Sequence, residues 1–383
     1  MARKVSVGVL GIGTVAELFY LEAIVKHGDR AELTALCDVV PGRAQAAADK
    51  WGARAAFTDL GEMLASTDVE AVLVLTKHSQ HYEHARQVLE AGRHLGIEKP
   101  IAATFEQATE IVELAEARGL KLAAAPAMAF EPVARRAEAL IAGGAIGRVA
   151  AVRTHMTANP ADRETEWRRI GPNLARIDTP PTDQTWMYQA GEGGPLFDLT
   201  PYQLIPPTRL LGPIKRVGAL AGIAVSERVS GSGPTRGERF ATTAPDNVVM
   251  LLDWGDDRFG TVYSGYLPAN FRGPHTEYYG DAGVLAVNGG TGVDNIELYR
   301  TVTGGRESRW EAVGEPNDGW DVVDRAGAIT HLVDCIADDA EVQLSARQAL
   351  HILEVIDVVH QSSAGGRFLP TTTTFELPGA LPV

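Results

Sequence analysis

Lys99 stands at the carboxyl end of a short apolar run and is the first candidate for chemistry. The run His94–Ile97 predicts a buried strand, and Glu98-Lys99-Pro100 follows it directly. In an open parallel sheet, the carboxyl ends of the strands form the edge where ligands bind. Pro100 has no amide N–H and a fixed φ, so it ends the strand and orients the lysine peptide. Taken alone, the segment is more simply a loop with a surface ion pair, so its interpretation depends on the rest of the chain.

An acid and a phenol four residues apart form the second candidate. The segment Gly193-Gly194-Pro195-Leu196-Phe197-Asp198-Leu199-Thr200-Pro201-Tyr202 predicts the start of a helix, and this spacing places Asp198 and Tyr202 on one helix face. Such a pair can flank a substrate hydroxyl, one group orienting it while the other exchanges its proton. The structural alternative is that Asp198 complements the helix dipole and Tyr202 is a half-buried core residue.

A glycine-rich turn precedes both candidates. Val5–Leu10 predicts a first strand, which runs into Gly11-Ile12-Gly13-Thr14-Val15-Ala16 and then an amphipathic helix. In this context G-x-G-x-x-A is a dinucleotide-binding pattern. The first glycine permits the tight turn, the second lets backbone amides approach a pyrophosphate, and the alanine lets helix and strand pack closely. The helix N-terminus adds N–H donors and a positive dipole end. The predicted cofactor contacts here are Gly11, Ile12, Gly13, Thr14 and Val15.

Asp38 ends the second predicted strand, Leu33–Cys37, and lies 22 positions after Ala16. A separation of about 20 is typical of the acid that binds a ribose 2′-hydroxyl. A carboxylate there repels a 2′-phosphate and therefore favours NAD over NADP, while Arg43 weakens this preference. The alternative role for Asp38 is an N-cap of the helix that begins near Pro41.

The loop after the next predicted strand, Val69–Leu75, carries several histidines. We expect Thr76–His81 to lie over the nicotinamide ribose at the carboxyl edge of the sheet. His78, His81 and His84 follow one another at three-residue intervals, but no acidic or cysteine ligand accompanies them, so no metal site is predicted. The further cofactor contacts predicted at this edge are Arg43, Thr76, His78, His81, Glu98 and Lys99.

The order of elements predicts an α/β chain with two domains. Alternating strands and helices over residues 1–125 indicate a doubly wound parallel sheet. Residues 126–383 carry consecutive strands with Gly/Asp turns, which indicate an α+β domain with a large, mainly antiparallel open sheet. Two closing helices can pack back on the first domain. One face of such a sheet needs cover, so we expect a homodimer or homotetramer that uses this sheet.

Four side chains of the second domain are predicted to recognise the shape and charge of a substrate. Arg153 and His155 belong to a strand, and Trp186 and Tyr188 lie in an irregular segment rich in polar residues and proline. Aromatic side chains in such a segment are either walls of a sugar-sized pocket or anchors that hold the loop.

Composition limits the class of protein. The 383 residues are 45% hydrophobic and 22% charged, as in ordinary globular proteins, and the net charge of −14 argues against nucleic acid or an anionic membrane as a partner. Cys37 and Cys335 lie far apart and form no metal-binding pattern. The first strand begins almost at Met1, which does not resemble a signal peptide, so a cytoplasmic location is expected.

Together these motifs resemble the Gfo/Idh/MocA family of pyridine-nucleotide oxidoreductases. The matching pieces, in the family's order, are the glycine turn, Thr76 with His81, Glu98-Lys99-Pro100, Gly193–Asp198 and, more weakly, Tyr279–Gly283. The resemblance implies a Rossmann domain and a substrate domain. It also implies hydride transfer between nicotinamide C4 of NAD, or of NADP, and a hydroxyl or carbonyl group of a sugar or polyol. Lys99 then lies beside the substrate and the nicotinamide.

The chain departs from the family at one catalytic position. Members commonly continue the second motif as Asp-x-Gly-x-His with the histidine as acid/base, whereas here Thr200 and Tyr202 replace glycine and histidine. Some relatives resemble this chain in carrying tyrosine there. A phenol with a pKa of about 10 is a poor base at neutral pH unless a nearby cation lowers that pKa, and Lys99 is the candidate. The hypothesis is a shared site in which Lys99 polarises the hydroxyl, Tyr202 relays its proton and Asp198 orients the substrate.

Two other functions compete with a dehydrogenase or reductase. In the first, a retained NAD is reduced and reoxidised in each cycle, and transient oxidation of a sugar carbon drives elimination of a glycosidic group. In the second, the chain is a dinucleotide-binding regulator, which the change at Tyr202 permits. Retention of Glu98-Lys99-Pro100 together with Asp198 favours catalysis, because a pure binding protein has no need of proton-handling groups.

Overall fold

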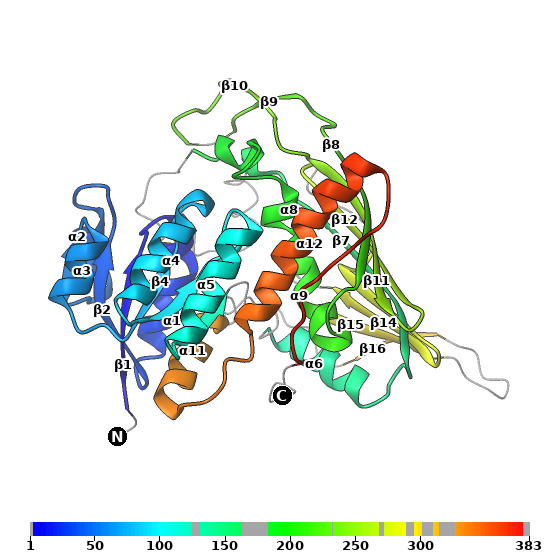
Figure 1. The fold of residues 1–383 in the computed structure, drawn as a ribbon, viewed down its shortest axis with the longest axis horizontal. Helices are drawn as coiled ribbons and strands as arrows, with labels where there is room; N and C mark the ends of the chain where they lie inside the picture. The colour runs from blue at the N-terminus through cyan, green and yellow to red at the C-terminus, as the bar shows by residue number, and fades with distance from the viewer. Residues whose placement is uncertain are drawn as a thin grey trace. The chain divides into compact units, whose positions relative to one another are not determined.

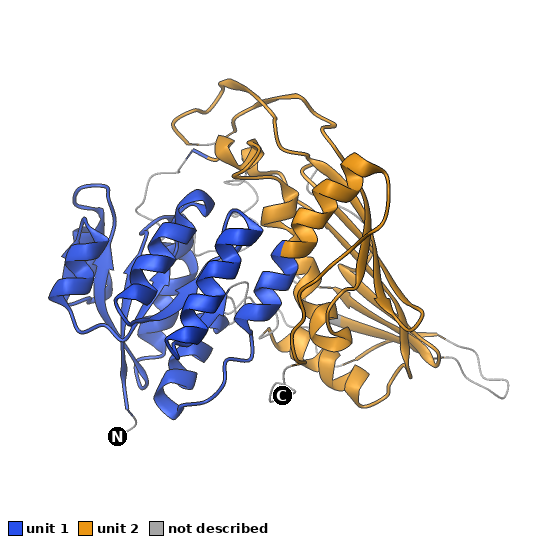
Figure 2. Ribbon diagram, in the orientation of Figure 1, with its two compact units in different colours: residues 1–127, 172–183, 321–353 blue, residues 128–171, 184–320, 354–383 orange. Residues whose placement is uncertain are grey.

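The computed structural model of the protein describes residues 3–124, 131–162, 183–231, 233–267, 272–288, 295–300, 309–313 and 326–377. The chain forms two compact units (Figure 2). The first comprises residues 1–127, 172–183 and 321–353, and the second comprises 128–171, 184–320 and 354–383. The first unit therefore contains a segment from near the end of the chain. The predicted domain boundary at residues 125 and 126 lies outside the described residues.

A six-stranded parallel sheet forms the centre of the first unit, in the order β3-β2-β1-β4-β5-β6. Most of its residues are buried, because helices cover both faces of the sheet. This confirms the predicted doubly wound sheet. The strands are β1 (Val5–Leu10), β2 (Ala31–Cys37), β3 (Ala55–Phe57), β4 (Ala71–Val74), β5 (His94–Ile97) and β6 (Leu122–Ala124).

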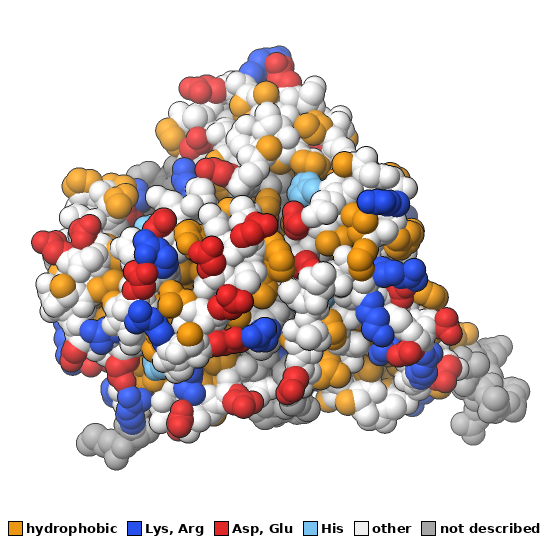
Figure 3. Space-filling model, in the orientation of Figure 1, with side chains coloured by type: hydrophobic (Ala, Val, Ile, Leu, Met, Phe, Trp, Pro, Cys, Tyr) orange, Lys and Arg blue, Asp and Glu red, His pale blue; other side chains and the backbone are white. Residues whose placement is uncertain are grey.

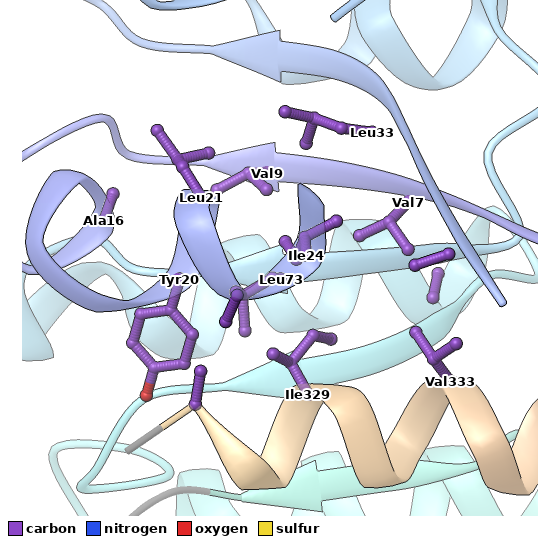
Figure 4. Packing of buried hydrophobic residues seen from close by; sticks show 14 of the residues in the cluster. Val7, Val9, Ala16, Tyr20, Leu21, Ile24, Leu33, Leu73, Ile329 and Val333 are labelled. Carbon is purple, nitrogen blue, oxygen red and sulfur yellow. The ribbon is translucent and has the colours of Figure 1, made fainter. Parts of the chain in front are cut away.

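Two helical layers cover this sheet. Contacts link α1 with α2 and α11, and α4 with α3 and α5. In the core on the first side, Val7 and Val9 of β1 lie near Leu21 of α1 and Ile329 of α11 (Figure 4). The helices are η1 (Ala16–Tyr20), α1 (Leu21–Lys26), α2 (Arg43–Trp51), α3 (Leu60–Ser66), η2 (His78–Gln80), α4 (His81–Glu90), α5 (Phe105–Ala117), α11 (Gly327–Asp338) and the first part of α12 (Ala346–Gly365).

The second unit is built on a nine-stranded sheet in the order β16-β15-β14-β13-β7-β12-β11-β8-β17. The pair β7–β12 is parallel and all other neighbours are antiparallel, which confirms the large, mainly antiparallel sheet. The strands are β7 (Val149–Thr157), β8 (Arg216–Gly222), β11 (Asn247–Gly255), β12 (Arg258–Gly265), β13 (Thr276–Gly280), β14 (Gly283–Asn288), β15 (Asn295–Arg300), β16 (Trp310–Ala312) and β17 (Leu369–Pro370), with a separate pair β9 (Glu227–Val229) and β10 (Arg239–Ala241).

Helices cover one face of this sheet (Figure 1). Helix α6 packs on β14 and β15, α8 on β11 and β12, and α9 on β7. The helix predicted to carry both Asp198 and Tyr202 is interrupted at Leu199, so Asp198 ends α8 while Tyr202 belongs to α9. The helical segments are η4 (Pro160–Asp162), α6 (Pro132–Ala142), η6 (Thr185–Tyr188), α8 (Pro195–Asp198), α9 (Thr200–Leu211) and the second part of α12.

The surface carries charges of both signs. Acidic and basic side chains are interspersed on the face shown in Figure 3, although acidic residues outnumber basic ones in the sequence by 49 to 35.

Among the described helices, none combines the length and the apolar character that crossing a bilayer requires.

Candidate active site

The two glycines of the turn between β1 and the first helix differ in their surroundings. The protein leaves no room for a side chain at Gly11, whereas Gly13 faces open space. Gly11 has φ of +92°, and a Cβ atom on it would lie 2.9 Å from the carbonyl carbon of Leu75. Only glycine satisfies both constraints. A Cβ on Gly13, in contrast, would meet no atom within 4 Å. The space beside Gly13 therefore fits the close approach of a pyrophosphate to the backbone, as the sequence pattern predicts.

The helix after this turn begins with a π-helical segment. The amide N–H of Leu21 donates to the carbonyl oxygen of Ala16, an i→i+5 bond that the sequence pattern did not predict. Isolated π turns occur frequently at functional sites. Tyr20, the last residue of this segment, is 2% exposed, and its hydroxyl donates to the Glu98 carboxylate. The glycine-turn helix is thereby connected to the Glu98-Lys99-Pro100 segment.

Asp38, 6% exposed at the end of β2, is bonded to the glycine turn. Its Oδ2 accepts from the Ile12 N–H at 2.8 Å and its Oδ1 from the Val40 N–H at 2.9 Å, while the guanidinium of Arg43 lies 3.4 Å from Oδ1. The alternative role as a helix cap is not observed, because Gly42 occupies the N-cap position of α2. Asp38 thus connects the end of β2 to the glycine turn.

Lys99 is the second residue after β5, at the carboxyl end of the strand as the sequence predicts, and is 8% exposed. Its backbone N–H donates to Oε2 of Glu98 at 2.9 Å, and Tyr20 donates to the other carboxylate oxygen. Both oxygens of Glu98 are therefore engaged within the protein. Glu98 therefore fixes the position of the Lys99 backbone.

His81 is enclosed by the protein, which differs from its predicted role as a cofactor contact. It is 0% exposed, with Nδ1 2.7 Å from the carbonyl oxygen of Pro100 and Nε2 3.0 Å from that of Thr76. Burial lowers the pKa of this imidazole, although the two carbonyl oxygens act in the opposite direction. Because both ring nitrogens face backbone carbonyls, His81 links the ends of β4 and β5 and has no nitrogen left for a nucleotide.

The neighbouring polar residues of this loop also bond to one another. The hydroxyl oxygen of Thr76 lies 3.0 Å from Nδ1 of His84. His78 is buried, and its ring lies edge-on to that of His81 with centroids 5.7 Å apart. Among the described residues there is no cluster of His, Cys, Asp and Glu side chains suited to a metal ion.

In the second unit, Asp198 is 4% exposed and is bonded to a residue that the sequence did not indicate. The hydroxyl of Tyr266 donates to Oδ2 of Asp198 at 2.8 Å. Tyr266 is fully buried and directly follows β12, 68 residues beyond Asp198. No spacing rule connects two residues so far apart, so only the packing of α8 against β12 identifies this pair.

Tyr202 is half-buried on α9 and lines a pocket that also contacts α6, β7, β13 and β14. Much of the lining is hydrocarbon, and its charged pair, Arg209 and Glu138, lies 3.3 Å apart. Burial, together with the nearby His155, lowers the pKa of His275 in this pocket to about 4, so its imidazole is neutral near pH 7. The Tyr202 phenol thus lies in a largely apolar pocket, and the His275 imidazole in that pocket carries no charge near pH 7.

Comparisons with known proteins agree with this architecture. A model described as "Oxidoreductase family, NAD-binding Rossmann fold" matches residues 5–125, and one described as "GFO/IDH/MocA C-terminal domain" matches residues 134–286. The two matches cover most of the chain and both units. The chain belongs to the Gfo/Idh/MocA oxidoreductase family.

Curated relatives match over different lengths. An uncharacterised oxidoreductase of Synechocystis sp. is 25% identical over 298 residues, which are 77% of this chain and 74% of the relative. D-glucoside 3-dehydrogenase of Escherichia coli is 38% identical over 117 residues, 30% of this chain and 33% of that protein. Inositol 2-dehydrogenase/D-chiro-inositol 3-dehydrogenase of Lactiplantibacillus plantarum is 31% identical over 122 residues, 32% and 35% of the two chains. The matches to named dehydrogenases thus span about a third of each.

Solved structures share the fold along nearly the whole chain. Levoglucosan dehydrogenase in complex with NADH has a TM-score of 0.80 at 17% identity, covering 97% of this chain and 100% of that one. An NAD-binding oxidoreductase from Klebsiella pneumoniae has a TM-score of 0.79 at 21% identity, covering 97% and 99%. At these identities the likeness establishes the fold. Together with the matched family model, it makes this an NAD-binding oxidoreductase of two-domain Gfo/Idh/MocA architecture.

In this Gfo/Idh/MocA protein, two predicted substrate contacts lie on the sheet face opposite the helices. Thr154 of β7 is buried and contacts Gln203 of α9, and side chains alternate along a strand, so Arg153 and His155 face the other way. Arg153 forms an ion pair of 2.6 Å with Glu277, and His155 packs on a neighbouring tyrosine ring. Burial, and then the nearby Arg153, lowers the pKa of His155. Both side chains therefore lie on the face of the sheet opposite α9, the helix that carries Tyr202.

The two predicted aromatic contacts are packing residues. Tyr188 is 0% exposed, and its hydroxyl accepts from the Ala161 N–H at 2.9 Å and donates to Asn159 at 3.2 Å. Trp186 packs against the same buried cluster. Their observed contacts are those of anchors that hold an irregular segment.

Proposed function

We propose that this protein is an NAD-dependent oxidoreductase that transfers a hydride between nicotinamide and a secondary hydroxyl or keto group of a sugar, polyol or glycoside. The observation that carries the proposal is Lys99, which is buried at the carboxyl edge of the parallel sheet, the edge that also carries the glycine turn and Asp38. An ammonium group at this edge suits an alcohol or carbonyl oxygen that gains or loses a proton as hydride moves. Bound NAD supplies the hydride acceptor.

Three side chains are assigned roles in the proposal. Lys99 stabilises the oxygen of the reacting hydroxyl, Tyr202 exchanges its proton, and Asp198 orients the substrate through a second hydroxyl. Family members commonly have a histidine at the position of Tyr202, and that histidine is the acid/base. Tyr202 takes the same role in the proposal, although a phenol is less acidic than an imidazolium. Support comes from the placement of Tyr202 in a pocket and from the buried, hydrogen-bonded carboxylate of Asp198.

The proposed substrate class follows the names of relatives. Those named above act on glucosides and inositols, and the levoglucosan dehydrogenase structures include complexes with L-sorbose and with levoglucosan. A cyclic compound with secondary hydroxyl groups is common to these names. We therefore propose a cyclic sugar, polyol or glycoside as the substrate.

The test is a panel of sugars, inositols, glycosides and their keto forms, assayed in both directions with NAD and with NADP. We expect net NADH formation, or NADH consumption with a keto compound, for at least one cyclic member. Cleavage of a glycoside without net NADH formation would instead support a lyase or hydrolase that cycles its NAD. Nucleotide binding without turnover of any member would support a regulator.

The structure also predicts a preference for NAD over NADP. We expect Asp38→Asn to lower this preference, measured as the ratio of kcat/KM values, roughly tenfold or more, because a charge-assisted bond to ribose is lost and repulsion of a 2′-phosphate is relieved. Asparagine keeps an oxygen that can accept from the Ile12 N–H, so the glycine turn is retained. Arg43→Ala removes the positive charge beside Asp38 instead of the negative one, so it should raise the preference for NAD. An unchanged ratio in both variants would remove Asp38 from cofactor selection.

A homo-oligomer is the proposed assembly. Alternation along the strands places the exposed apolar side chains of the nine-stranded sheet on the face opposite α6, α8 and α9. These are Leu220, Val249, Leu251, Phe259, Tyr279 and Trp310, which are 37–72% exposed. An extended apolar face on a sheet suits a second copy of the same chain across a twofold axis.

We expect the double variant Leu251→Asp with Phe259→Asp to sediment as a single chain while the unmodified protein sediments as a multiple. Buried charge without a partner opposes association. Val229→Asp, a change of an equally exposed residue on the separate β9 strand, is the matched control and should not alter the mass. If the unmodified protein sediments as a single chain at micromolar concentration, the proposed assembly is wrong.

A further inference from the structure

Tyr266 makes the contact that distinguishes Asp198 from an ordinary helix-terminal acid. Its hydroxyl donates to Oδ2 of Asp198 at 2.8 Å, with the tyrosine 0% and the aspartate 4% exposed. A phenol that donates to a buried carboxylate forms a charge-assisted bond, which is stronger and more directional than a neutral one. One oxygen of Asp198 is thereby given a fixed direction.

The backbone of Tyr266 is held on both sides by a buried ion pair. Its N–H donates to the carbonyl oxygen of Asp246 at 2.8 Å, and its carbonyl oxygen accepts from the Arg228 guanidinium at 2.7 Å. Arg228 also pairs with the Asp246 carboxylate at 2.6 Å, with side chains 11% and 1% exposed. Asp246 accepts two further bonds, from the N–H groups of Ala224 and Val225. This pair therefore ties Tyr266 to the segment before β9 and to the start of β11.

The ring of Tyr266 is held as well. It meets the ring of Tyr188 edge-on, with centroids 5.2 Å apart, and the guanidinium of Arg228 lies over the Tyr188 ring at 4.6 Å. Edge-to-face aromatic contacts and a cation above an aromatic face both stabilise such an arrangement. Because backbone and ring are both fixed, the phenol has little freedom to leave Asp198.

We infer that Tyr266 is a positioning residue that orients the Asp198 carboxylate toward the substrate, and that the Arg228–Asp246 pair fixes Tyr266. The inference rests on the proposed function, in which Asp198 orients the substrate. A reacting group has to be held within about half an ångström of its productive position, and residues behind the site provide this. Tyr266 and the Arg228–Asp246 pair form such a support, and no sequence motif contains them.

The test is a double-mutant cycle that compares Tyr266→Phe in two backgrounds, wild type and Asp198→Asn. In the wild-type background, loss of a bond to a carboxylate should lower kcat/KM for the sugar or polyol roughly 10- to 100-fold. The loss should fall mainly on kcat, with the KM for NAD unchanged. In the Asp198→Asn background, Tyr266→Phe should change kcat/KM by no more than about twofold, because it acts through a carboxylate that is already absent.

Two further variants separate positioning from general stability. Tyr82→Phe removes the same kind of bond, from a phenol to the Glu110 carboxylate, on the surface of α4 and α5, and should leave kcat/KM within about twofold. Asp246→Asn weakens the support of Tyr266 without touching Asp198, so it should give a smaller loss that also disappears in the Asp198→Asn background. Asp246→Asn extends the test if Tyr266→Phe lowers the melting temperature so far that its kinetics cannot be measured.

The outcomes distinguish the inference from the function on which it rests. If Asp198→Asn keeps wild-type kinetics, the assigned role of Asp198 is wrong. If Asp198→Asn is impaired but Tyr266→Phe costs the same factor in both backgrounds, Asp198 keeps its role and the positioning inference is overturned. An equal loss in Tyr82→Phe would likewise overturn it.

Discussion

Lys99→Met is expected to abolish turnover, by at least about a thousandfold, while NAD binding remains measurable. Methionine has nearly the length of lysine but no charge, so it fills the same space without stabilising a developing alkoxide. The lysine is 8% exposed and its backbone is held by Glu98, so the change should not disturb the end of β5. Steady-state rates give the first quantity and titration of nucleotide fluorescence gives the second.

Lys121→Met is the matched control for this variant. Lys121 immediately precedes β6, so it lies at the amino edge of the same parallel sheet, where its ammonium contacts Asp339 and the carbonyl oxygen of Ala340. Ligands bind at the carboxyl edge of such sheets, so its removal should leave kcat near the wild-type value. Turnover within tenfold of wild type in Lys99→Met would show that Lys99 has no part in the chemistry.

Tyr202→Phe is expected to lower turnover ~10²–10⁴-fold, the usual contribution of a positioned proton-transfer group. Phenylalanine keeps the ring in the pocket between α6, α9 and the sheet but removes the hydroxyl. The rate of hydride transfer should fall, whereas the affinity for NAD should not. Single-turnover measurements of NADH formation provide the rate, because they exclude product release.

Tyr202→His is the informative companion. Imidazole titrates near pH 6.5 and phenol near pH 10, so a histidine that takes over the proton transfer should move the rising limb of the rate profile toward lower pH. If Lys99 and Tyr202 act on one hydroxyl, the double variant Lys99→Met with Tyr202→Phe should lose little more than the worse single variant. Wild-type rates in Tyr202→Phe would remove the phenol from the mechanism.

The architecture of both units follows closely from local sequence. Apolar runs such as Val5–Leu10 and His94–Ile97 coincide with β1 and β5 because strands buried on both faces need apolar side chains throughout. Thr104 caps α5, with its hydroxyl oxygen accepting the Gln107 N–H at 3.3 Å, and this Thr-x-x-Gln spacing is typical of the start of a helix. Short edge strands such as β3 (Ala55–Phe57) were not predicted, since three residues carry too little periodicity.

The sequence predicted which residues lie at the candidate site better than it predicted what those residues contact. The glycine turn, Asp38 and Lys99 all lie at the carboxyl edge of the first sheet, because the order of strands and helices determines which ends of the strands meet. His81 was predicted to contact the cofactor, but its ring is enclosed between two backbone carbonyl oxygens. Residue type alone does not distinguish a histidine that binds a ligand from one that links two loops.

The sequence by itself determined the fold class, the dinucleotide-binding turn and the lysine after β5. Each depends on residues adjacent along the chain, where backbone geometry and hydrophobic periodicity act directly. Only the tertiary structure decided that Asp198 is bonded to Tyr266, that Tyr20 is bonded to Glu98, and that Arg153 faces away from α9. These contacts join residues up to 78 positions apart, and they depend on strand register and helix packing, which no local pattern encodes.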